Sequence, residues 1–274
     1  MESVMPEGPE VRRYTDFLES KIRGKRLTCV EIVSGRYKKH GPFSGYEKIP
    51  LNIIIRSVEC YGKLLYINLI DDNDVETFLL STLGMSGAWQ SKPTKHNRIT
   101  LRLDDGSSVY YNDIRNFGTL KYVSHDELEK KLGKMGLDFL QYTWDSDKFN
   151  NKMNKKPNKT IAEFLMDQSM CAGIGNYLKA EILYECEISP HRLVKDIVYS
   201  ERQNLLRVMT KITRMSYRYG GATISTYRDG NGKEGLYNRR FAVYNQKSDL
   251  HGNPVIKEQT KDKRTTHWVP NIQK

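Results

Sequence analysis

The sequence predicts an α+β fold in which a β-rich, sandwich- or barrel-like N-terminal domain with a leading helix precedes a mostly helical domain that ends in a β-hairpin. Three observations support this prediction. The chain has 274 residues, more than a single hydrophobic core usually serves, so two domains are expected. Residues 28–123 contain many short β-branched or aromatic segments separated by Gly, Asp, Asn or Pro, a pattern typical of sandwiches and barrels. Residues 160–219 instead repeat their apolar side chains at helical spacing.

The N-terminal elements follow from these patterns in order. A helix is expected over residues 10–22, because Val11, Tyr14 and Leu18 recur at helical spacing behind a proline, which is favoured in a first turn. Seven short strands are then expected, at residues 28–33, 52–58, 64–69, 77–80, 99–103, 109–112 and 119–123. Helical spacing returns at Leu128, which predicts a further helix.

The C-terminal half is expected to be mostly helical, after a polar, Lys- and Asn-rich run at residues 145–159 that is expected to be a linker or surface loop. Helices are expected at residues 160–167, 176–186 and 200–219. A turn at Gly252–Pro254 and strand patterns around it predict a terminal hairpin, with strands at residues 240–244, 255–257 and 265–268. The resulting boundaries are an N-terminal domain at 6–140, a linker at 141–159, a helical domain at 160–236 and the hairpin at 237–274.

The charge balance indicates a polyanionic partner. Lys and Arg outnumber Asp and Glu by 44 to 33, which gives a net charge of +11; a basic surface that serves solubility alone is the alternative. Nucleic acid is favoured over a membrane surface because no strongly amphipathic basic helix stands out and the 17 Tyr are interleaved with the basic residues. Apolar runs such as residues 63–70 are too short to cross a bilayer.

The N-terminus and the cysteines predict an intracellular protein in a reducing compartment, either the nucleus or the cytoplasm. The opening Met-Glu-Ser-Val-Met lacks the basic and apolar regions of a secretory signal. The cysteines are scattered, with no two at the spacing of a thiolate metal site: Cys29, Cys60, Cys171 and Cys186. A disulfide scaffold and a thiolate zinc site are both disfavoured.

A short motif near the N-terminus carries the candidate chemistry. It is Pro6-Glu7-Gly8-Pro9-Glu10-Val11. A free α-amine titrates near 8, against about 10.4 for Lys, so far more of it is neutral and nucleophilic at pH 7. A prolyl amine that condenses with a sugar aldehyde gives an iminium that cannot lose its charge by deprotonation, and Glu7 beside it can move protons. A plain helix start is the alternative.

Met1 to Met5 precede this proline, and while they remain the nitrogen of Pro6 is an amide and no nucleophile. We expect translation to start at Met5, because a Met followed by Pro is a natural substrate for methionine removal, whereas a Met followed by Glu is usually retained. Residues 1–5 would then be absent from the active protein. Trimming of a longer leader, or use of another amine, are the alternatives.

Seven further motifs follow in order along nearly the whole chain. They are Cys60-Tyr61-Gly62-Lys63, Leu83-Gly84-Met85-Ser86-Gly87, Asp113-Ile114-Arg115-Asn116-Phe117-Gly118, Leu165-Met166-Asp167-Gln168, Gly173-Ile174-Gly175-Asn176-Tyr177, Gly220-Gly221-Ala222-Thr223 and Val243-Tyr244. Together with the proline motif they resemble the formamidopyrimidine-DNA glycosylase and endonuclease VIII family. Any one motif is a weak signal, but their order and spacing are specific. The resemblance implies a helix-two-turn-helix around Gln168–Asn176 and a terminal finger hairpin.

The resemblance implies catalytic roles for several residues. Pro6 would be the Schiff-base nucleophile that attacks C1′ of the damaged nucleotide, and Glu7 the acid/base that opens the sugar and relays protons. Glu10 resembles the second carboxylate at the helix start. Lys63 would bind the phosphate beside the lesion, and Arg264 at the hairpin tip would bind another phosphate. Taken alone, Lys63 is equally a strand-end lysine, and the run around Arg264 a solvated charge cluster.

Other residues are implied in DNA binding. Met85, Arg115 and Phe117 match the residues that fill the space left by an extruded base; the alternative is a core Met and Phe with a surface Arg. Asn176 would donate to a phosphate at a helix N-terminus, and Glu181 matches a family carboxylate one turn later; a plain helix C-cap is the alternative for the two glycines before Asn176. The residues from 220 to 235 are expected to form a mobile loop, which in the family covers a flipped purine lesion.

The terminal hairpin departs from the bacterial pattern of four zinc-binding cysteines. This tail has no cysteine, and His251 and His267 alone cannot close a tetrahedral site. The resemblance therefore implies the zincless finger known in part of the family, with no metal and no organic cofactor. Asn116 is a second departure, because bacterial relatives often carry Arg there, and it affects local contacts only.

Together these observations predict a bifunctional DNA glycosylase and abasic-site lyase that excises oxidised bases by base flipping and a proline Schiff base, then cleaves the strand by β- or β,δ-elimination. The expected partner is damaged duplex DNA, with single strands left open, bound by a monomer and without a membrane. A catalytically silent protein that binds abasic or damaged DNA is the alternative, and a structural nucleic-acid module is a third. The choice between oxidised purines and pyrimidines stays open.

Overall fold

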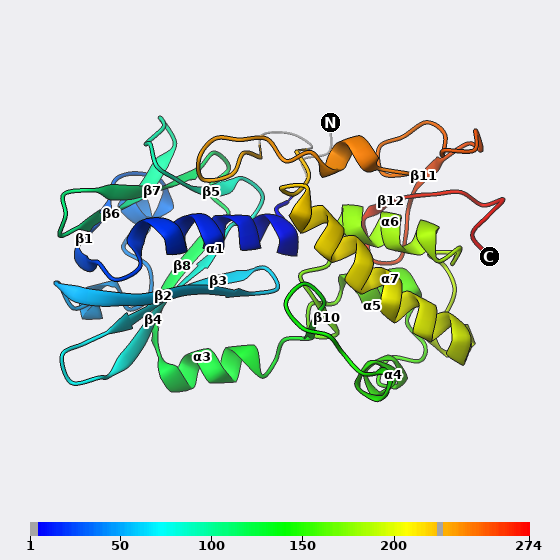
Figure 1. Cartoon of the computed structure of the whole chain (residues 1–274), viewed down its shortest axis with the longest axis horizontal. Helices are drawn as coiled ribbons and strands as arrows, with labels where there is room; N and C mark the ends of the chain where they lie inside the picture. The colour runs from blue at the N-terminus through cyan, green and yellow to red at the C-terminus, as the bar shows by residue number, and fades with distance from the viewer. Residues whose placement is uncertain (1–4, 224–226) are drawn as a thin grey trace. The chain divides into compact units, whose positions relative to one another are not determined.

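Two compact units make up residues 5–223 and 227–274, which the computed structural model describes (Figure 1). The sheet unit consists of the described residues within Met1–Pro6, Glu10–Lys134 and Gly220–Gly235; the helical unit consists of Glu7–Pro9, Met135–Tyr219 and Leu236–Lys274. Residues 1–4 of the expected leader and 224–226 of the expected lesion loop lie outside the described residues. The domain boundaries expected from the sequence stay a prediction.

One antiparallel sheet, eight-stranded over the described residues, forms the sheet unit. Its strands are β1 (Arg26–Ile32), β2 (Ile53–Tyr61), β3 (Leu64–Ile70), β4 (Glu76–Thr82), β5 (Gly87–Gln90), β6 (Asn97–Leu103), β7 (Ser108–Asp113) and β8 (Thr119–Ser124). They lie in the order β5-β7-β6-β1-β2-β3-β4-β8. The seven expected strands are all present. β5 was not expected, because its four residues are too short to show an alternating pattern.

Short helices accompany the sheet: α1 (Gly8–Ile22), α2 (Arg36–His40), the 3₁₀ turn η1 (Tyr46–Lys48) and α3 (His125–Leu132). α1 confirms the leading helix, and its apolar stripe is buried, with Val11, Tyr14 and Leu18 at most 1% exposed. α3 begins with a capping box in which Ser124 and Glu127 bond to each other's backbone amides. α2 buries no residue, so it shows no helical stripe in the sequence.

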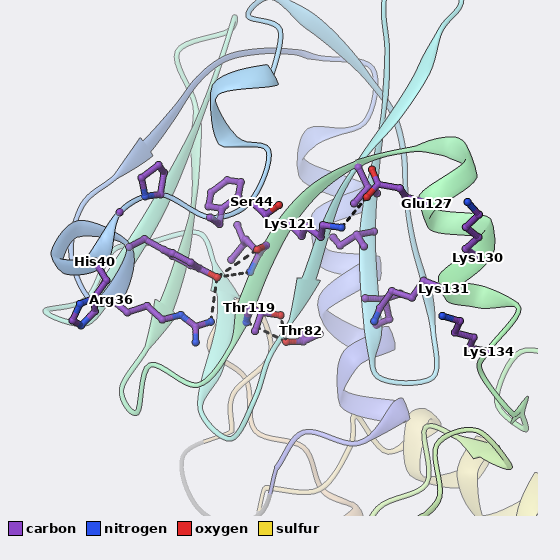
Figure 2. A pocket seen from close by; sticks show the side chains of 18 residues that line it. Arg36, His40, Ser44, Thr82, Thr119, Lys121, Glu127, Lys130, Lys131 and Lys134 are labelled. Atoms are coloured by element: carbon purple, nitrogen blue, oxygen red, sulfur yellow. Dashed lines mark hydrogen bonds and ion pairs between the residues drawn. The ribbon is translucent and has the colours of Figure 1, made fainter.

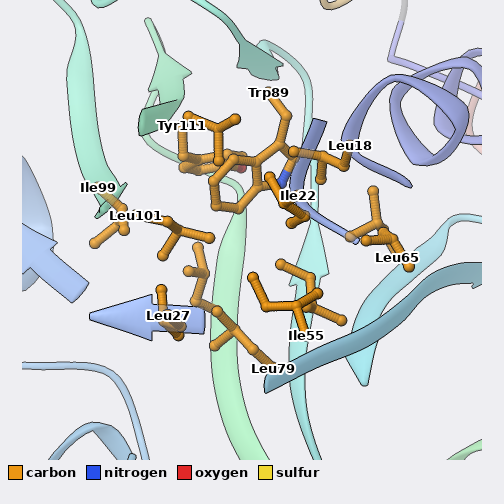
Figure 3. Packing of buried hydrophobic residues seen from close by; sticks show 14 of the residues in the cluster. Leu18, Ile22, Leu27, Ile55, Leu65, Leu79, Trp89, Ile99, Leu101 and Tyr111 are labelled. Atoms are coloured by element: carbon orange, nitrogen blue, oxygen red, sulfur yellow. The ribbon is translucent and has the colours of Figure 1, made fainter. Parts of the chain in front are cut away.

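The hydrophobic core lies where the sheet folds back on itself (Figure 3). Trp89 of β5 donates from Nε1 to Oγ of Ser81 in β4 at 3.1 Å. Tyr111 of β7 donates from Oη to the carbonyl of Thr82 at 3.0 Å. Because β5 and β4 lie near opposite ends of the strand order, these bonds close the sheet into the sandwich-like arrangement that the sequence predicts.

A groove of about 800 Å³ is lined by β8 and its neighbours β4 and β3, by α2 with the segment after it, and by α3 (Figure 2). Oη of Tyr37 accepts from the amide of Leu120 at 2.9 Å, and the carbonyl of Ser44 accepts from the amide of Tyr122 at 2.9 Å. These bonds occupy backbone groups of an edge strand and so oppose pairing with a second sheet. The groove-lining lysines of α3 and the residues after it are Lys130, Lys131 and Lys134.

The helical unit contains, in chain order, β9 (Leu137–Asp138), α4 (Ser146–Asn154), α5 (Ile161–Met166), β10 (Cys171–Ala172), α6 (Asn176–Glu185), η2 (Val194–Asp196), α7 (Tyr199–Arg218), η3 (Tyr237–Arg240), β11 (Ile256–Gln259) and β12 (Thr265–Trp268). α5, α6 and α7 confirm the expected helices. β10 lies in the segment between α5 and α6 and pairs with β9 in parallel. Over the described ranges, no helix is both long enough and apolar enough to span a membrane.

Part of the run expected to be a loop is helical. α4 occupies residues 146–154, inside the expected linker. Asp145 caps it by accepting from the amide of Lys148 at 2.7 Å. Phe149 and Met153 are fully buried one turn apart. Two apolar anchors are too few to show a period in a polar run, but they are enough to dock a short helix.

The C-terminal segment makes the expected turn and a second turn that forms the hairpin. The expected turn lies between Ser248 and Pro254, which form an antiparallel bridge. β11 and β12 pair antiparallel over their full length, so the hairpin itself turns at residues 260–264. The strand expected at residues 240–244 is absent: η3 ends at Arg240, and the next amides donate to the Glu181 carboxylate. Buried aromatic and β-branched side chains in this segment account for its strand-like pattern.

Candidate active site

Glu7 lies at the N-terminus of α6 in the helical unit, and its side chain is 1% exposed. Oε2 accepts from the amides of Gly175 at 2.7 Å and Leu178 at 3.3 Å, and Oε1 accepts from the amide of Tyr177 at 2.9 Å. The first amides of a helix lack partners within the helix and carry the positive end of its dipole. They therefore stabilise an ionised carboxylate at one fixed place.

Two glycines before α6 allow this close approach. Gly173 adopts φ +89°, and its carbonyl accepts from the amide of Gly8 at 2.9 Å. A Cβ on Gly175 would lie 2.3 Å from Cδ of Glu7. Both glycines precede the helix, so a helix C-cap does not explain them. The positive φ accounts for Gly173, and the close contact with the Glu7 side chain accounts for Gly175.

Pro6 directly precedes Glu7 and is partly buried. Its nitrogen is bonded to Met5 in this chain, so it becomes an amine only after residues 1–5 are removed. By its contacts Pro6 belongs to the sheet unit, whereas Glu7 belongs to the helical unit. The two candidate groups are therefore adjacent along the chain and anchored in different units.

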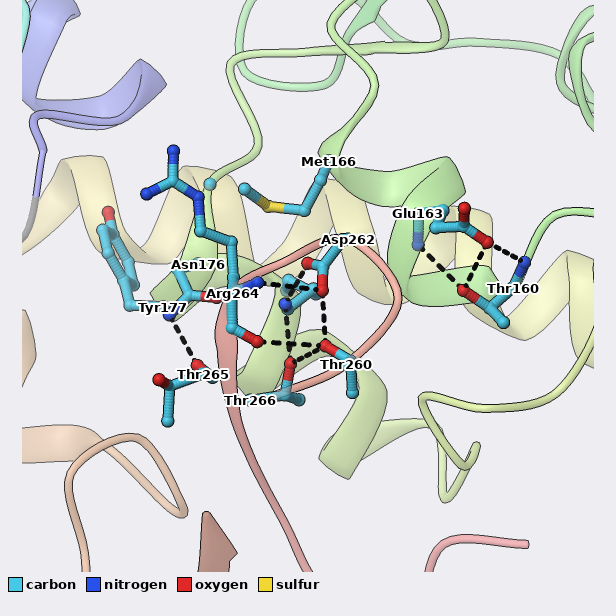
Figure 4. Close-up of polar contacts among 12 residues, drawn as sticks. Thr160, Glu163, Met166, Asn176, Tyr177, Thr260, Asp262, Arg264, Thr265 and Thr266 are labelled. Atoms are coloured by element: carbon cyan, nitrogen blue, oxygen red, sulfur yellow. Dashed lines mark hydrogen bonds and ion pairs between the residues drawn. The ribbon is translucent and has the colours of Figure 1, made fainter. Parts of the chain in front are cut away.

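Asn176, at the start of α6, lies beside the hairpin turn that carries Arg264 (Figure 4). Asn176 donates from Nδ2 to the carbonyl of Thr265 at 2.9 Å, so the first residue of α6 contacts the first residue of β12. The carbonyl of Arg264 accepts from the amide of Thr260 at 3.1 Å. The Arg264 side chain is exposed and extends away from the polar cluster beneath the turn. The turn thus presents a guanidinium to solvent.

Lys179 is a buried cation that the sequence analysis missed. Its side chain is 0% exposed, Nζ lies 2.5 Å from Oδ2 of Asp262, and Nζ donates to Oγ1 of Thr266 at 2.8 Å. Burial lowers the pKa of Lys179, and the Asp262 carboxylate opposes this shift. A signal was present in the sequence, because a lysine between Leu178 and Ala180 in a helix without a polar face needs a buried partner.

Glu181 is directed toward the backbone of the segment before the hairpin. Its carboxylate accepts from the amides of Ala242 at 2.8 Å, Val243 at 3.0 Å and Tyr244 at 2.8 Å. Burial raises the pKa of Glu181, and the three amide bonds oppose this shift. These contacts support the chain leading to the hairpin; a direct contact of Glu181 with DNA stays a prediction.

Lys63 and Glu10 lie on separate elements of the sheet unit. Lys63 is on the two-residue turn between β2 and β3, after a glycine with φ +56°. Glu10 is 2% exposed and accepts from the amide of Ala222 at 2.7 Å. A Cβ on Gly221 would lie 2.7 Å from Oε1 of Glu10. Glu10 therefore anchors the start of the segment that was expected to cover a lesion.

Met85, Arg115 and Phe117 come together on two neighbouring loops of the sheet unit. Oγ of Ser86 accepts from the amide of Arg115 at 2.8 Å and donates to Oδ1 of Asp113 at 2.5 Å, which joins the loop after β4 to the loop after β7. The Arg115 guanidinium lies 5.0 Å from the centre of the Phe117 ring. Phe117 is 54% exposed and Met85 is half-buried, so the alternative of a core phenylalanine fails.

The predicted residues are thus distributed over both units. In the helical unit, α6 or the hairpin that it contacts carries Asn176, Glu181 and Arg264, and the N-terminus of α6 binds Glu7. In the sheet unit, one loop cluster contains Met85, Arg115 and Phe117, apart from the elements of Lys63 and Glu10. Among the residues that the structure describes, no three His, Cys, Asp or Glu side chains are grouped so that they could hold a metal ion.

Family models match consecutive parts of the chain. They are the formamidopyrimidine-DNA glycosylase N-terminal domain at residues 5–120, its H2TH domain at residues 135–228 and its C-terminal domain at residues 237–274. The formamidopyrimidine-DNA glycosylase of Prochlorococcus marinus is 30% identical, over 98% of this chain and 100% of that protein. The one of Pelotomaculum thermopropionicum is 27% identical, over 98% and 99%.

Solved structures share the fold. The MutM (Fpg) protein from Thermus thermophilus superposes with a TM-score of 0.86 at 26% identity, over 98% of each chain. Lactococcus lactis Fpg in complex with abasic-site DNA superposes with a TM-score of 0.84 at 26% identity, over 98% of this chain and 99% of that one. These matches confirm the predicted α+β architecture, and the cysteine-free hairpin β11–β12 fits the zincless type. The chain therefore belongs to the formamidopyrimidine-DNA glycosylase family.

Proposed function

We propose that this protein is a DNA glycosylase that excises oxidised bases and then cleaves the strand at the resulting abasic site. Membership in the family supports the first activity. Structures of the Lactococcus lactis relative with abasic-site DNA and with DNA containing an oxidised pyrimidine, together with the net charge of +11, support damaged DNA as the partner. The observation that carries the proposal is the Glu7 carboxylate fixed on the α6 amides directly after Pro6.

The reaction would begin at a free Pro6 amine. Its nitrogen forms a bond to C1′ of the damaged nucleotide while the bond from C1′ to the base breaks, and the base leaves with a proton. Opening of the sugar ring gives an iminium between the proline nitrogen and C1′, which acts as an electron sink. Loss of a proton from C2′ then expels the 3′ phosphate, and water releases the amine. Glu7 would accept and return protons in these steps.

The remaining predicted residues would hold the DNA. Lys63, Asn176 and Arg264 would contact phosphates, which contribute affinity without reading sequence. The exposed loop cluster around Arg115 and Phe117 would fill the stack when a base is flipped out, an exchange that costs least for a damaged base. The preference for damaged over normal bases would then depend partly on this cost.

We expect borohydride to trap the protein covalently on abasic-site DNA once residues 1–5 have been removed, because reduction converts the iminium into a stable amine. Mass spectrometry of the digested adduct should place the link on Pro6. The matched control is the chain that retains Met5, whose amide nitrogen forms no iminium and should give no adduct.

Two results would contradict this assignment of the nucleophile: a link on an internal lysine, or an equal yield of adduct from the chain that retains Met5. If neither chain gives an adduct and abasic-site DNA still binds tightly, a catalytically silent damaged-DNA-binding protein would be favoured instead.

We expect Arg115→Ala or Phe117→Ala to reduce base excision from duplex DNA on the order of tenfold more than strand cleavage at a preformed abasic site, where no base has to be flipped. Both side chains are exposed, so circular dichroism should show an unchanged fold. Ile114→Ala, at a 50% exposed neighbour in the same loop, is the control and should affect neither assay. Equal losses in the two assays would argue against a role in flipping.

A further inference from the structure

The terminal hairpin depends on contacts outside itself. β11 and β12 have four residues each, and a two-stranded hairpin of this size is marginally stable in water. Residues 237–274 contain no cysteine, and the described ranges contain no group of metal ligands. The turn at residues 260–264, which carries Arg264, must therefore be stabilised by the helix against which β12 packs.

A buried polar network beneath the turn provides this contact. The dashed lines of Figure 4 connect Thr260, Asp262 and Thr266. The Thr260 hydroxyl bonds to the Asp262 carboxylate and lies 2.6 Å from the Thr266 hydroxyl. Nζ of Lys179, from α6, contacts Asp262 at 2.5 Å and Thr266 at 2.8 Å. One ammonium thus joins residues on both sides of the turn to the helix.

The same ammonium lies among the charges of the proposed site. The charged groups that act on Lys179 are Asp262, Glu7 and Arg264: burial lowers the pKa of Lys179 most, the two carboxylates raise it, and Arg264 lowers it further. Electrostatic interaction is mutual. The positive charge of Lys179 therefore attracts the Glu7 carboxylate, which the α6 amides also bind.

We propose that Lys179 is a positioning residue for DNA binding and base excision, which ties the Arg264 turn to α6, the helix whose first amides bind the Glu7 carboxylate. This inference rests on the proposed roles of Glu7 and Arg264. A buried cation of the chain itself would then hold the phosphate-binding arginine to the same helix that binds the proton-transfer carboxylate.

The test compares two double variants that each remove one ion pair without changing the net charge. Lys179→Met/Asp262→Asn removes both partners of the buried pair. Removal of one partner alone would leave the other as an uncompensated buried charge and destabilise the fold. Lys211→Met/Glu185→Gln removes an exposed pair at 2.5 Å in the same unit, with side chains 47% and 40% exposed, and is the matched control. Thermal melts establish that both variants fold.

We expect the Lys179 double variant to bind abasic-site DNA roughly tenfold more weakly than the wild type, with no further loss when Arg264→Ala is added. The slope of log affinity against log salt concentration should become less steep by roughly 0.9, the contribution of one phosphate contact. Arg264→Ala alone should change the slope by the same amount. The Lys211 control should match the wild type in both measurements.

Unchanged binding, or a loss that adds in full to that of Arg264→Ala, would overturn the role of Lys179. If Arg264→Ala itself leaves binding unchanged, or the wild type excises no base, the proposed function fails instead. Hydrogen exchange separates the two cases. The amides of residues 260–266 should exchange faster in the Lys179 double variant than in the wild type and the control. Equal exchange rates would contradict the claim that Lys179 stabilises the turn, whatever the activity.

Discussion

Glu7→Gln is expected to lower the rate of base excision by about 10²- to 10⁴-fold, the usual contribution of a general acid–base group. Glutamine matches glutamate in size but cannot accept a proton at neutral pH. Single-turnover excision from a lesion-containing duplex measures the loss directly. Binding of abasic-site DNA should change far less, because the phosphate contacts come from other residues.

The same variant should also lose stability, although side-chain size alone predicts an unchanged fold. Both oxygens of Glu7 accept amide hydrogen bonds from the start of α6. Glutamine keeps one acceptor and turns an NH₂ donor toward an amide donor, which costs about 1–3 kcal/mol. At roughly 2–4 °C per kcal/mol for a domain of this size, a thermal melt resolves the effect.

Glu47→Gln is the control for both measurements, because Glu47 is an exposed carboxylate in η1 of the sheet unit. It should melt and excise like the wild type. Full excision activity in a folded Glu7→Gln protein would remove Glu7 from the reaction. A wild-type melting temperature would contradict the described amide bonds.

Gly175→Ala should reduce excision by about 10²-fold although it changes no ionisable group, since a displacement of about 1 Å can cost this much. The new Cβ would lie 2.3 Å from Cδ and 2.4 Å from Oε1 of Glu7, so the carboxylate has to move. The backbone at Gly175 is extended, with φ −133° and ψ −160°, a conformation open to alanine. The effect therefore acts through Glu7 and not through backbone strain.

Gly133→Ala provides the matched substitution, because Gly133 has helical φ/ψ and its added Cβ would come no closer than 3.3 Å to the carbonyl of Glu129. We expect it to leave excision unchanged. Excision at the wild-type rate by a folded Gly175→Ala protein would contradict the contact between this position and the Glu7 carboxylate.

Local patterns predicted most elements because each strand or helix buries one face, and burial leaves a period in the sequence. The strands from β1 to β4 and from β6 to β8 were found in this way, as were the helices α1, α5, α6 and α7. α4 was not predicted, because its buried residues are Phe149 and Met153 alone, too few to show a helical period. Residues 240–244 misled the prediction because their apolar side chains are buried without a strand partner.

Motif order was enough to place the chain in its family and to nominate Glu7, Arg115 and Arg264. It could not find Lys179, whose carboxylate partner lies 83 residues away along the chain. It could not establish that Phe117 is exposed, because a phenylalanine in a loop is equally compatible with a core position. The sequence shows directly that the tail contains no cysteine, but it does not show the contacts that stabilise the cysteine-free hairpin.

Periodicity, composition and motif spacing are properties of the chain, so the elements, the basic charge and the candidate residues could be obtained without a fold. The partners of the buried charges required the folded molecule: Glu7 on the amides of α6, Lys179 against Asp262, and Glu181 on the backbone of residues 242–244. A buried charge persists only where a partner lies within a few ångströms. Distances of that size are set by packing between segments remote in sequence, and no local pattern records them.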